Sequence, residues 1–408
     1  MSPGPAGEAS PAPARAGKVV ELRPRATTAA GRAAARPLRT LFLIDELDIG
    51  GTEQQILELV RRIDRRRFDP VVCCFRHGAK AREIESLGVP VVHEPKSLKA
   101  DPGLVLRLAR MMRRGRFDIV QTYLWGANTW GRVAARLAGV PHVLASERNV
   151  DVWEDRYKLV LGRLLARATD RIIANSEAVR SYLLERGVAP DKVVTIYNGV
   201  NFDRFRTACD PAVRRAEISL PPDAILAGTV ARVEPAKDHA TLLTAFSLIA
   251  ERIPRLHLAI VGGGSELDRL RGMADDLGVG GRVHFTGART DAAEWLQSVD
   301  FSILSSVKEG LSNTVLESMA AGRAMVATDV GGNGEVVVEG ETGYLVPARD
   351  PKSLAEAIAR LASSEERIRA FGRAGQERVH DLFSVERMVE RTQSLYLSIA
   401  APGTRVAA

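Results

Sequence analysis

Short apolar runs alternate with amphipathic stretches along most of this chain. The apolar run Leu41–Asp45 is followed by residues 53–63, which carry apolar side chains at helical spacing, and then by Val71–Phe75 and residues 81–87. A short run rich in β-branched and aromatic residues predicts a strand, and a longer periodic stretch predicts a helix. Strands that alternate with helices imply a parallel sheet with crossover helices.

This alternation occurs in two series. We expect further strands of the first series at residues 118–122, 142–146, 171–174 and 193–196. An irregular stretch follows at 198–223. We expect the strands of the second series at 225–230, 256–261, 283–286, 301–304 and 324–327. The prediction is an α/β protein with two Rossmann-like, doubly wound domains at residues 39–200 and 201–383, whose cleft faces the carboxyl ends of both sheets. Residues 384–400 have a helical pattern, and residues 401–408 form a short tail.

The N-terminal segment differs from the rest of the chain in composition. Residues 1–38 consist mainly of Ala, Pro, Gly and Arg with few large apolar side chains, so we expect them not to fold. No apolar run reaches the roughly 20 residues that span a bilayer, and the first residues lack the apolar core of a signal peptide. We therefore expect a cytoplasmic protein.

The cysteines and histidines predict neither disulfides nor a metal site. Cys73, Cys74 and Cys209 offer no disulfide framework, and we interpret all three as buried small hydrophobes in a reducing compartment. The seven histidines show no ligand pairing, and no Cys-x-x-Cys is present. We expect no metal ion and no cofactor.

Charge is distributed unevenly between the two halves. Residues 39–202 hold 27 Lys and Arg against 20 Asp and Glu, a net +7, whereas residues 203–408 hold 24 against 28, a net −4. Arginines cluster at 61–67 and at 113–116. These clusters are either solvated helix ends or a surface for peripheral contact with anionic lipid heads at the inner face of a membrane. Nucleic acid is disfavoured as a partner, because aromatic residues do not interleave with the basic ones.

Two glutamates flank a predicted helix start in the second half. Glu309 and Glu317 lie eight positions apart in Glu-Gly-Leu-Ser-Asn-Thr-Val-Leu-Glu, and Ser312 or Asn313 is expected to cap the helix. The free amides of such an end attract phosphate, and a carboxylate accepts hydrogen bonds from two hydroxyls. The pattern suits a ligand with a sugar, a diphosphate and a ribose.

This segment resembles the Glu-x7-Glu signature of retaining GT-B glycosyltransferases of family 4. Val230-Ala-Arg232-Val-Glu-Pro-Ala-Lys237 resembles the turn that supplies that family's two cations, with Ala231 and Asp238 where the family usually has Gly. The glycine loop at 260–266, the loop at 285–289 and the connection at 197–201 also match in order and spacing, from about Leu38 to Tyr396. The resemblance implies that residues 384–400 cross back onto the first domain.

The resemblance implies a nucleotide-sugar donor as substrate, for which we expect a uridine nucleotide, and a glycan or lipid-linked acceptor. It assigns roles to three sets of residues. Catalytic residues would be Glu309, Arg232 and Lys237, and donor-binding residues would be Glu317, Gly310, Leu311, Ser312, Asn313, Thr314, Gly263 and Arg289. Acceptor-side candidates are Gly50, Gly51, Thr52, Tyr123, Glu147 and Arg148, with Tyr123 standing where relatives often have His.

Other interpretations remain for these motifs. The loop 48–53 could be an ordinary turn capped by Thr52 or Glu53, Glu147 and Arg148 a surface ion pair, and Gly262-Gly263-Gly264 a tight turn. Hydride transfer is disfavoured, because Leu267 takes the third glycine place of a dinucleotide fingerprint. Two rival functions are a nucleotide-sugar 2-epimerase on the same fold and a non-catalytic nucleotide-sugar-binding subunit.

Overall fold

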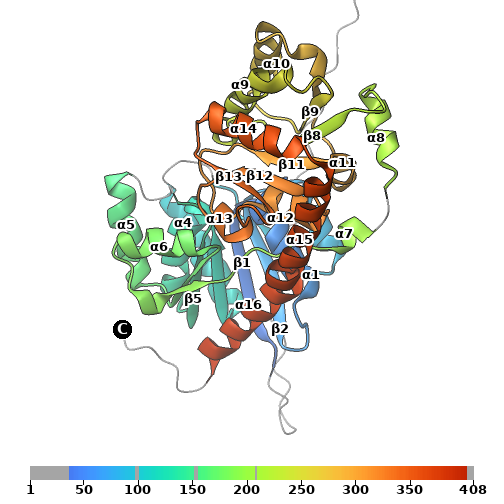
Figure 1. The fold of residues 1–408 in the computed structure, drawn as a ribbon. Coiled ribbons are helices and arrows are strands. Elements are labelled where there is room, and N and C mark those ends of the chain that lie inside the picture. The colour runs from blue at the N-terminus through green and yellow to red at the C-terminus, as the bar shows by residue number, and fades with distance from the viewer. Residues whose placement is uncertain (1–35, 97–100, 151–154, 207–208, 402–408) are drawn as a thin grey trace, which may run out of the picture.

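The computed structural model describes residues 36–96, 101–150, 155–206 and 209–401. Its first sheet has seven parallel strands in the order β3-β2-β1-β4-β5-β6-β7 (Figure 1). The strands are β1 (Leu38–Glu46), β2 (Phe68–Arg76), β3 (Val91–His93), β4 (Ile119–Tyr123), β5 (His142–Glu147), β6 (Arg171–Ala174) and β7 (Val193–Thr195). The order reverses at β1, so the sheet is doubly wound and its switch point lies between β1 and β4.

Helices cover both faces of this sheet. One face carries α1 (Gly51–Arg62), α2 (Ala79–Ser86) and the final helix α16 (Val385–Ala400), and the other carries α3 (Pro102–Gly115) and α4 (Leu124–Ala138). Two further helices, α5 (Arg156–Arg167) and α6 (Glu177–Glu185), pack beside β5 and β6. Figure 1 shows α16 running down from the second domain onto the first, where Tyr396 is fully buried between Phe42 and Phe68.

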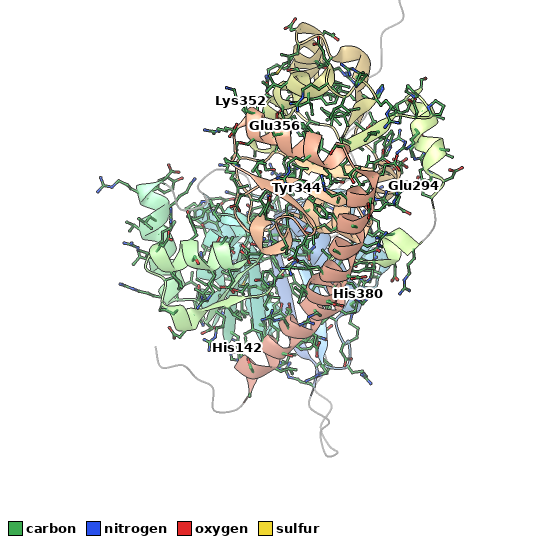
Figure 2. All side chains as sticks on the ribbon, viewed as in Figure 1. His142, Glu294, Tyr344, Lys352, Glu356 and His380 are labelled. Carbon is green, nitrogen blue, oxygen red and sulfur yellow. The ribbon has the colours of Figure 1, made fainter. Side chains whose placement is uncertain are left out.

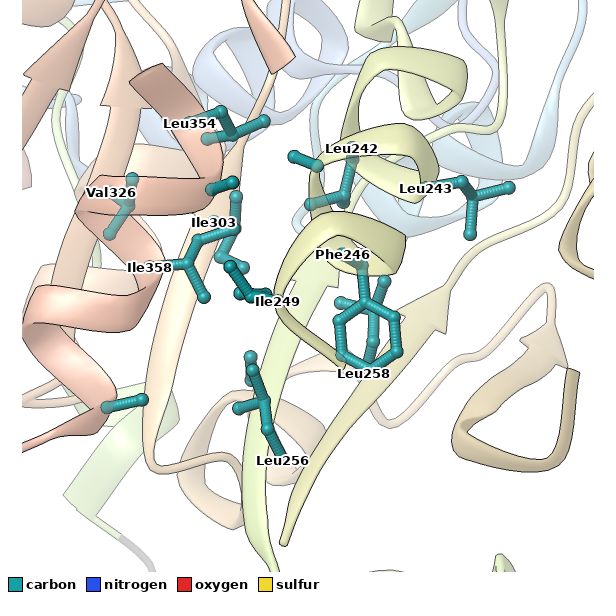
Figure 3. Close-up of a cluster of buried hydrophobic side chains, with 14 of the residues drawn as sticks. Leu242, Leu243, Phe246, Ile249, Leu256, Leu258, Ile303, Val326, Leu354 and Ile358 are labelled. Atoms are coloured by element: carbon teal, nitrogen blue, oxygen red, sulfur yellow. The ribbon is translucent and has the colours of Figure 1, made fainter. Parts of the chain in front are cut away.

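The second sheet has six parallel strands in the order β10-β9-β8-β11-β12-β13. They are β8 (Ile225–Val230), β9 (Leu256–Val261), β10 (Val283–Gly287), β11 (Phe301–Leu304), β12 (Ala324–Thr328) and β13 (Gly343–Val346). The helices α9 (His239–Ala250), α10 (Leu267–Asp276) and α14 (Pro351–Ala362) contribute to the core shown in Figure 3. On the other face lie α11 (Ala292–Ser298), α12 (Asn313–Ala320), α13 (Asn333–Val336) and α15 (Glu365–Phe383).

The amphipathic pattern explains which side of each helix is buried. In α14, Leu354 and Ile358 lie one turn apart and enter the core, whereas Lys352 and Glu356 project outward (Figures 2 and 3). A residue four positions further along a helix returns to the same face, so this spacing places apolar side chains together.

The predicted fold class is confirmed, with local differences. The stretch expected to be irregular, 198–223, contains two short helices, α7 (Asp203–Arg206) and α8 (Pro211–Glu217), the second capped by Asp210. The sequence pattern did not indicate β3 or β13, which have three and four residues. Cys73 and Cys74 are buried, but Cys209 is partly exposed, so its interpretation as a buried hydrophobe was wrong. The predicted tails at 1–38 and 401–408 lie almost wholly outside the described residues.

Candidate active site

The site begins with a salt bridge at the strand ends of the second domain. Lys237 Nζ donates to Glu309 Oε1 at 2.5 Å, and Ser306 Oγ donates to the same oxygen at 2.7 Å. Lys237 ends a single 3-10 turn, η2 (Pro235–Lys237), and Glu309 lies in the loop after β11. Both contacts go to Oε1, so Oε2 remains available to a ligand hydroxyl. The structure thus brings together two of the predicted catalytic residues.

Backbone contacts hold this turn and this loop in register. Val307 N donates to Ala236 O at 3.0 Å, and Ser305 Oγ donates to Lys237 O at 2.8 Å. The relative position of Lys237 and Glu309 is therefore set by main-chain geometry as well as by their own charges. Such preorganisation lets a cation act on a ligand without reorganising first.

Arg232, the other predicted cation, lies beside an open hollow. The side chain follows β8, is exposed, and makes no hydrogen bond or ion pair with any described residue. The hollow has a volume of about 530 Å³ and is lined by Arg232, Glu234, Pro235, Ala236, Val307, Lys308 and Arg349. Three of these side chains are cationic and one is acidic, so the hollow favours an anion.

The glycine loop after β9 serves close packing. A Cβ on Gly262 would lie 1.9 Å from Ala231 O, and one on Gly264 would lie 2.2 Å from Val233 O. Val233 N also donates to Gly263 O at 2.9 Å. These contacts support the tight-turn interpretation, because the glycines let this loop lie against the turn that carries Arg232. A donor contact by Gly263 stays a prediction.

The helix α12 starts where the sequence indicated. Ser312 is the N-cap residue and Asn313 the first helical residue, but the Ser312 hydroxyl makes no capping hydrogen bond. Thr314 Oγ1 donates to Val230 O at 3.1 Å, which ties the helix start to β8, and Leu311 and Ser312 are buried beneath it. The free amides of this first turn are the phosphate-binding groups that the sequence predicts.

Asn313 connects the two domains. Its Nδ2 donates to Gly51 O at 3.0 Å, and its Oδ1 accepts from Asn198 Nδ2 at 2.8 Å. A Cβ on Gly51 would lie 2.9 Å from that amide nitrogen, so glycine permits the approach. The start of α1 and the start of α12 are therefore in direct contact.

Gly310 and Glu335 form a second contact between the domains. Ser176 Oγ donates to Gly310 O at 3.0 Å, and a Cβ on Gly310 would lie 2.1 Å from Arg148 O. The Glu335 carboxylate of α13 accepts from the backbone N–H groups of Glu177 and Ala178 at 2.8 Å each. It thereby satisfies free donors at the start of α6, where a negative charge is favourable.

Two of the acceptor-side candidates are buried, and their acceptor roles stay predictions. Tyr123 and Glu147 are each only 3 % exposed, so neither side chain faces the open cleft. Tyr123 accepts a hydrogen bond from Gln121 Nε2 at 2.7 Å, and burial raises the pKa of its hydroxyl. Glu147 lies near the fully buried Arg132 and does not form a surface pair with Arg148. Its negative charge favours the charged form of Arg132 and so counteracts the lowering of that residue's pKa by burial.

The remaining acceptor-side candidates lie at the domain boundary. The Arg148 guanidinium donates to Asn198 Oδ1, and burial lowers its pKa while Tyr123 and Glu53 oppose that shift. Gly50 is the N-cap of α1, and a Cβ there would lie 2.2 Å from the Glu53 carboxylate, so a larger residue would require the Glu53 side chain to shift. Thr52 follows in the first turn of α1 and is partly exposed.

Two predicted donor-binding residues have partners within the protein. Glu317 Oε1 accepts from Arg204 at 2.6 Å. The Arg289 guanidinium forms two hydrogen bonds with Asp291, at 2.8 and 2.7 Å, and an ion pair with Glu217. A ribose hydroxyl would share Glu317 with Arg204, so the donor roles of Glu317 and Arg289 stay predictions.

Sequence reasoning did not place two residues of α1, Glu53 and Gln55, at the boundary between the domains. Glu53 is 7 % exposed, burial raises its pKa, and it lies near enough to Arg148 and Arg232 for their charges to oppose that shift. Gln55 exchanges two hydrogen bonds with the Gly199 backbone, at 2.9 and 2.8 Å. Both follow the Gly50-Gly51 pair within four residues of Gly51, which is the signal that could have drawn attention to them.

Two further features concern metals and membranes. Within the described ranges, no three His, Cys, Asp or Glu side chains gather closely enough to hold a metal ion. Over the same ranges, no helix combines the length and apolarity required to cross a bilayer. The sequence-based expectation of metal-free chemistry stays a prediction.

Two facing Rossmann-like domains, with cations and a carboxylate at the strand ends of the second, define the GT-B class of glycosyltransferase. Residues 213–378 match the family model described as glycosyl transferases group 1, and residues 49–204 match glycosyltransferase family 4. A D-inositol 3-phosphate glycosyltransferase of Catenulispora acidiphila is 33 % identical over 362 residues, covering 80 % of this chain and 84 % of the relative. The chain therefore belongs to glycosyltransferase family 4 and is a transferase enzyme.

Solved structures agree on the fold. HepE of Anabaena, in complexes with UDP and with UDP-glucose, has a TM-score of 0.80 and 22 % identity, covering 88 % of this chain and 100 % of that one. Sucrose-phosphate synthase of Thermosynechococcus elongatus has a TM-score of 0.75 and 22 % identity, covering 88 % and 99 %. At these identities the similarity concerns the fold alone.

Proposed function

We propose that this enzyme transfers a sugar from a UDP-linked donor to a glycan or lipid-linked acceptor with retention of anomeric configuration. The observation that carries the proposal is the Lys237–Glu309 pair, because the residues that precede each of them, Ala236 and Lys308, line the open hollow together with Arg232. It places a cation, and a carboxylate with one free oxygen, next to a space that favours an anion. UDP complexes of a structural neighbour support the choice of base.

The proposed mechanism follows from where charge develops. Breaking the bond between the anomeric carbon and the phosphate leaves negative charge on the diphosphate, and groups that bind this charge more tightly in the transition state lower the barrier. Arg232, Lys237 and the first-turn amides of α12 would supply this stabilisation. Glu309 would orient the sugar by accepting from its hydroxyls through Oε2.

The acceptor proton needs a destination. In the proposed reaction the departing phosphate takes it, which fits a site where Glu309 is already held by Lys237 and Ser306, and Glu234 accepts from Ser265. Water must be kept out, because hydrolysis of the donor competes with transfer. The contacts of Gly310 and Asn313 with the first domain would close the site against water.

Binding and transfer test this proposal in turn. Calorimetric titration with UDP, GDP and ADP, first in EDTA and then in magnesium, should show metal-independent binding of UDP that weakens in Lys237→Ala. Binding by none of the three nucleotides would contradict it. Lys352→Ala is the matched control, because Lys352 is exposed on the outer side of α14 (Figure 2).

Product analysis then separates the rival functions. Transfer from UDP-sugars should be assayed with glycan, polyprenyl-phosphate and inositol 3-phosphate acceptors, the last because the curated relatives bear that name. An epimerase would change the donor without any acceptor, and a non-catalytic subunit would bind without turnover. Cytoplasmic location and peripheral membrane contact stay predictions.

A further inference from the structure

Three neighbouring helices of the first domain carry only positive charge. Together α3, α4 and α5 contain ten Lys or Arg and no Asp or Glu. They adjoin one another, since α4 contacts both α3 and α5. Such a run of helices without one acidic residue is unexpected in a chain where Lys and Arg outnumber Asp and Glu only by 57 to 50.

The opposite face of the same sheet provides a comparison. There α1, α2 and α16 contain six Lys or Arg and six Asp or Glu. Arg61 and Arg62, from the first of the two arginine clusters seen in the sequence, are both paired with Glu58. The uneven charge of this half of the chain is therefore concentrated on one face.

Six of the ten basic residues are exposed and form no ion pair with a described residue. They are Arg110, Arg113, Arg114, Arg156, Arg163 and Arg167. Three others pair with carboxylates outside these helices, and Arg132 is buried. We call these six arginines, with the exposed apolar residues below, the cationic face.

Exposed apolar side chains gather on the same helices. Ten large hydrophobic side chains are exposed among the described residues, and six of them lie on the cationic face. They are Leu106 of α3, Val133 and Leu137 of α4, and Tyr157, Val160 and Leu164 of α5. Apolar groups left in water beside unpaired cations indicate a partner that is both apolar and anionic.

The helix α5 shows the pattern most clearly. Its outward side presents Tyr157, Val160 and Leu164, which are 64, 57 and 54 % exposed, and next to them the exposed Arg156, Arg163 and Arg167. These residues recur at helical spacing, so they form one stripe. A helix with cations and Tyr, Val or Leu on its outer side is typical of helices that lie in the interface of an anionic membrane.

We infer that the cationic face docks on an anionic lipid bilayer, with the apolar side chains of α5 entering the headgroup region. A second copy of this chain fits poorly, because docking face to face would oppose like charges. The inference goes beyond the glycosyltransferase activity and does not depend on the donor assignment. It names the surface through which the peripheral contact expected from charge alone would occur.

Vesicle flotation of the full chain tests the inference. The probes are vesicles of phosphatidylcholine alone and of an equal mixture with phosphatidylglycerol. Binding is expected only to the mixture, and should weaken at high salt. Arg156→Gln/Arg163→Gln/Arg167→Gln should reduce partitioning about 100-fold, since each basic residue near such a surface contributes about fivefold.

A matched variant controls for net charge. Arg65→Gln/Arg66→Gln/Arg67→Gln removes the same charge from exposed arginines after α1, so it should leave partitioning within about twofold if the face matters. Equal losses in both variants would show attraction by total charge and overturn the inference. The apolar contribution is tested by Tyr157→Ser/Val160→Ser/Leu164→Ser against Val213→Ser/Leu248→Ser, which are exposed elsewhere.

Other outcomes are distinguishable. Failure of wild-type chain to float with the anionic mixture would overturn the inference, and so would a dimer in light scattering that the serine variant of α5 dissociates. Nucleotide binding, measured in parallel by calorimetry, reports on the proposed function alone. An α5 variant that binds UDP normally but no longer floats would support docking as a separate property.

Discussion

The two walls of the cleft present their charged groups in opposite ways. On the second-domain wall Arg232 is exposed and Lys237 is fixed by Glu309, beside a hollow open to solvent. On the first-domain wall Glu53 and Glu147 are 7 and 3 % exposed. The difference teaches that the second-domain wall is organised before any ligand arrives, whereas the first-domain wall offers mainly backbone groups and the Arg148 region.

Removing the fixed cation of the second wall should have the largest effect. Lys237→Ala should lower kcat/KM, because the variant loses about 2 to 4 kcal/mol of transition-state stabilisation, as an enzyme does when one oxyanion donor is removed. Arg232→Ala should cost less, because Lys237→Ala also leaves Glu309 with Ser306 as its remaining partner at Oε1. Steady-state kinetics with Lys352→Ala as control would check this order, and unchanged turnover in Lys237→Ala would remove Lys237 from the site.

Separating the walls should have the next largest effect. Gly310→Ala places a Cβ 2.1 Å from Arg148 O, so the domains must move apart, and kcat/KM should fall about 100-fold through misplacement of the reacting groups. Small-angle scattering should show a larger radius of gyration.

Gly281→Ala is the matched control for that change. A Cβ at Gly281 meets no atom within 4 Å, so activity and shape should stay as in the wild type. A fully active Gly310→Ala enzyme would show that this contact is dispensable.

Behind the second wall, a buried histidine should make stability sensitive to acid. His239 is 3 % exposed, and burial, with Lys237 nearby, lowers its pKa to about 4. The unfolded chain takes up a proton on His239 near pH 6.5, whereas the folded chain does not. The contribution of neutral His239 to the free energy of unfolding is therefore fully present above about pH 6.5. It is lost as the pH falls toward 4, by about 3 kcal/mol in all.

Substitution of that histidine should make the free energy of unfolding less dependent on pH in the acid range. Denaturant unfolding should be measured between pH 4 and pH 7, a range that spans the pKa of about 4 in the folded chain and the usual histidine pKa of about 6.5. Over this range His239→Leu should lose less stability than the wild type. His380→Leu, at an exposed histidine of α15 (Figure 2), should keep the wild-type slope. Parallel curves for His239→Leu and wild type would rule out this origin of acid sensitivity.

The smallest effect concerns the ribose end of the donor. Glu317→Ala should raise the donor KM about tenfold with little change in kcat, as loss of one hydrogen-bonded charged group of about 1.4 kcal/mol would do. Arg204→Ala separates this role from a structural one, since it removes only the partner of Glu317. If both variants change KM alike, Glu317 acts through the ion pair and does not hold the ribose.

The sequence predicted the frame of this site well, for a physical reason. Strand ends and helix starts follow from apolar periodicity, so the positions of Arg232, Lys237, Glu309 and α12 were all within reach of local pattern. The short strands β3 and β13 were not, because three or four residues carry too little periodicity.

Contacts between distant segments were beyond that reach. Glu147 and Tyr123 are the last residues of β5 and β4, and Arg232 lies two residues after β8, yet only the first two are buried, Glu147 near Arg132 and Tyr123 against Gln121. The Asn313–Gly51 contact joins residues 262 positions apart, and no local pattern encodes it. What decides exposure at a strand end is the neighbour across the fold, which a single sequence does not reveal.

The course of α16 has a consequence for how the chain is made. Val385, Met388 and Tyr396 complete the core beside β1 and β2, although the whole second domain separates them from those strands in the sequence. On a ribosome, the first domain, which ends near residue 200, would emerge well before the helix that finishes it, which begins at Val385. Its apolar surface would then stay uncovered during synthesis of the second domain, so the half made first is the half completed last.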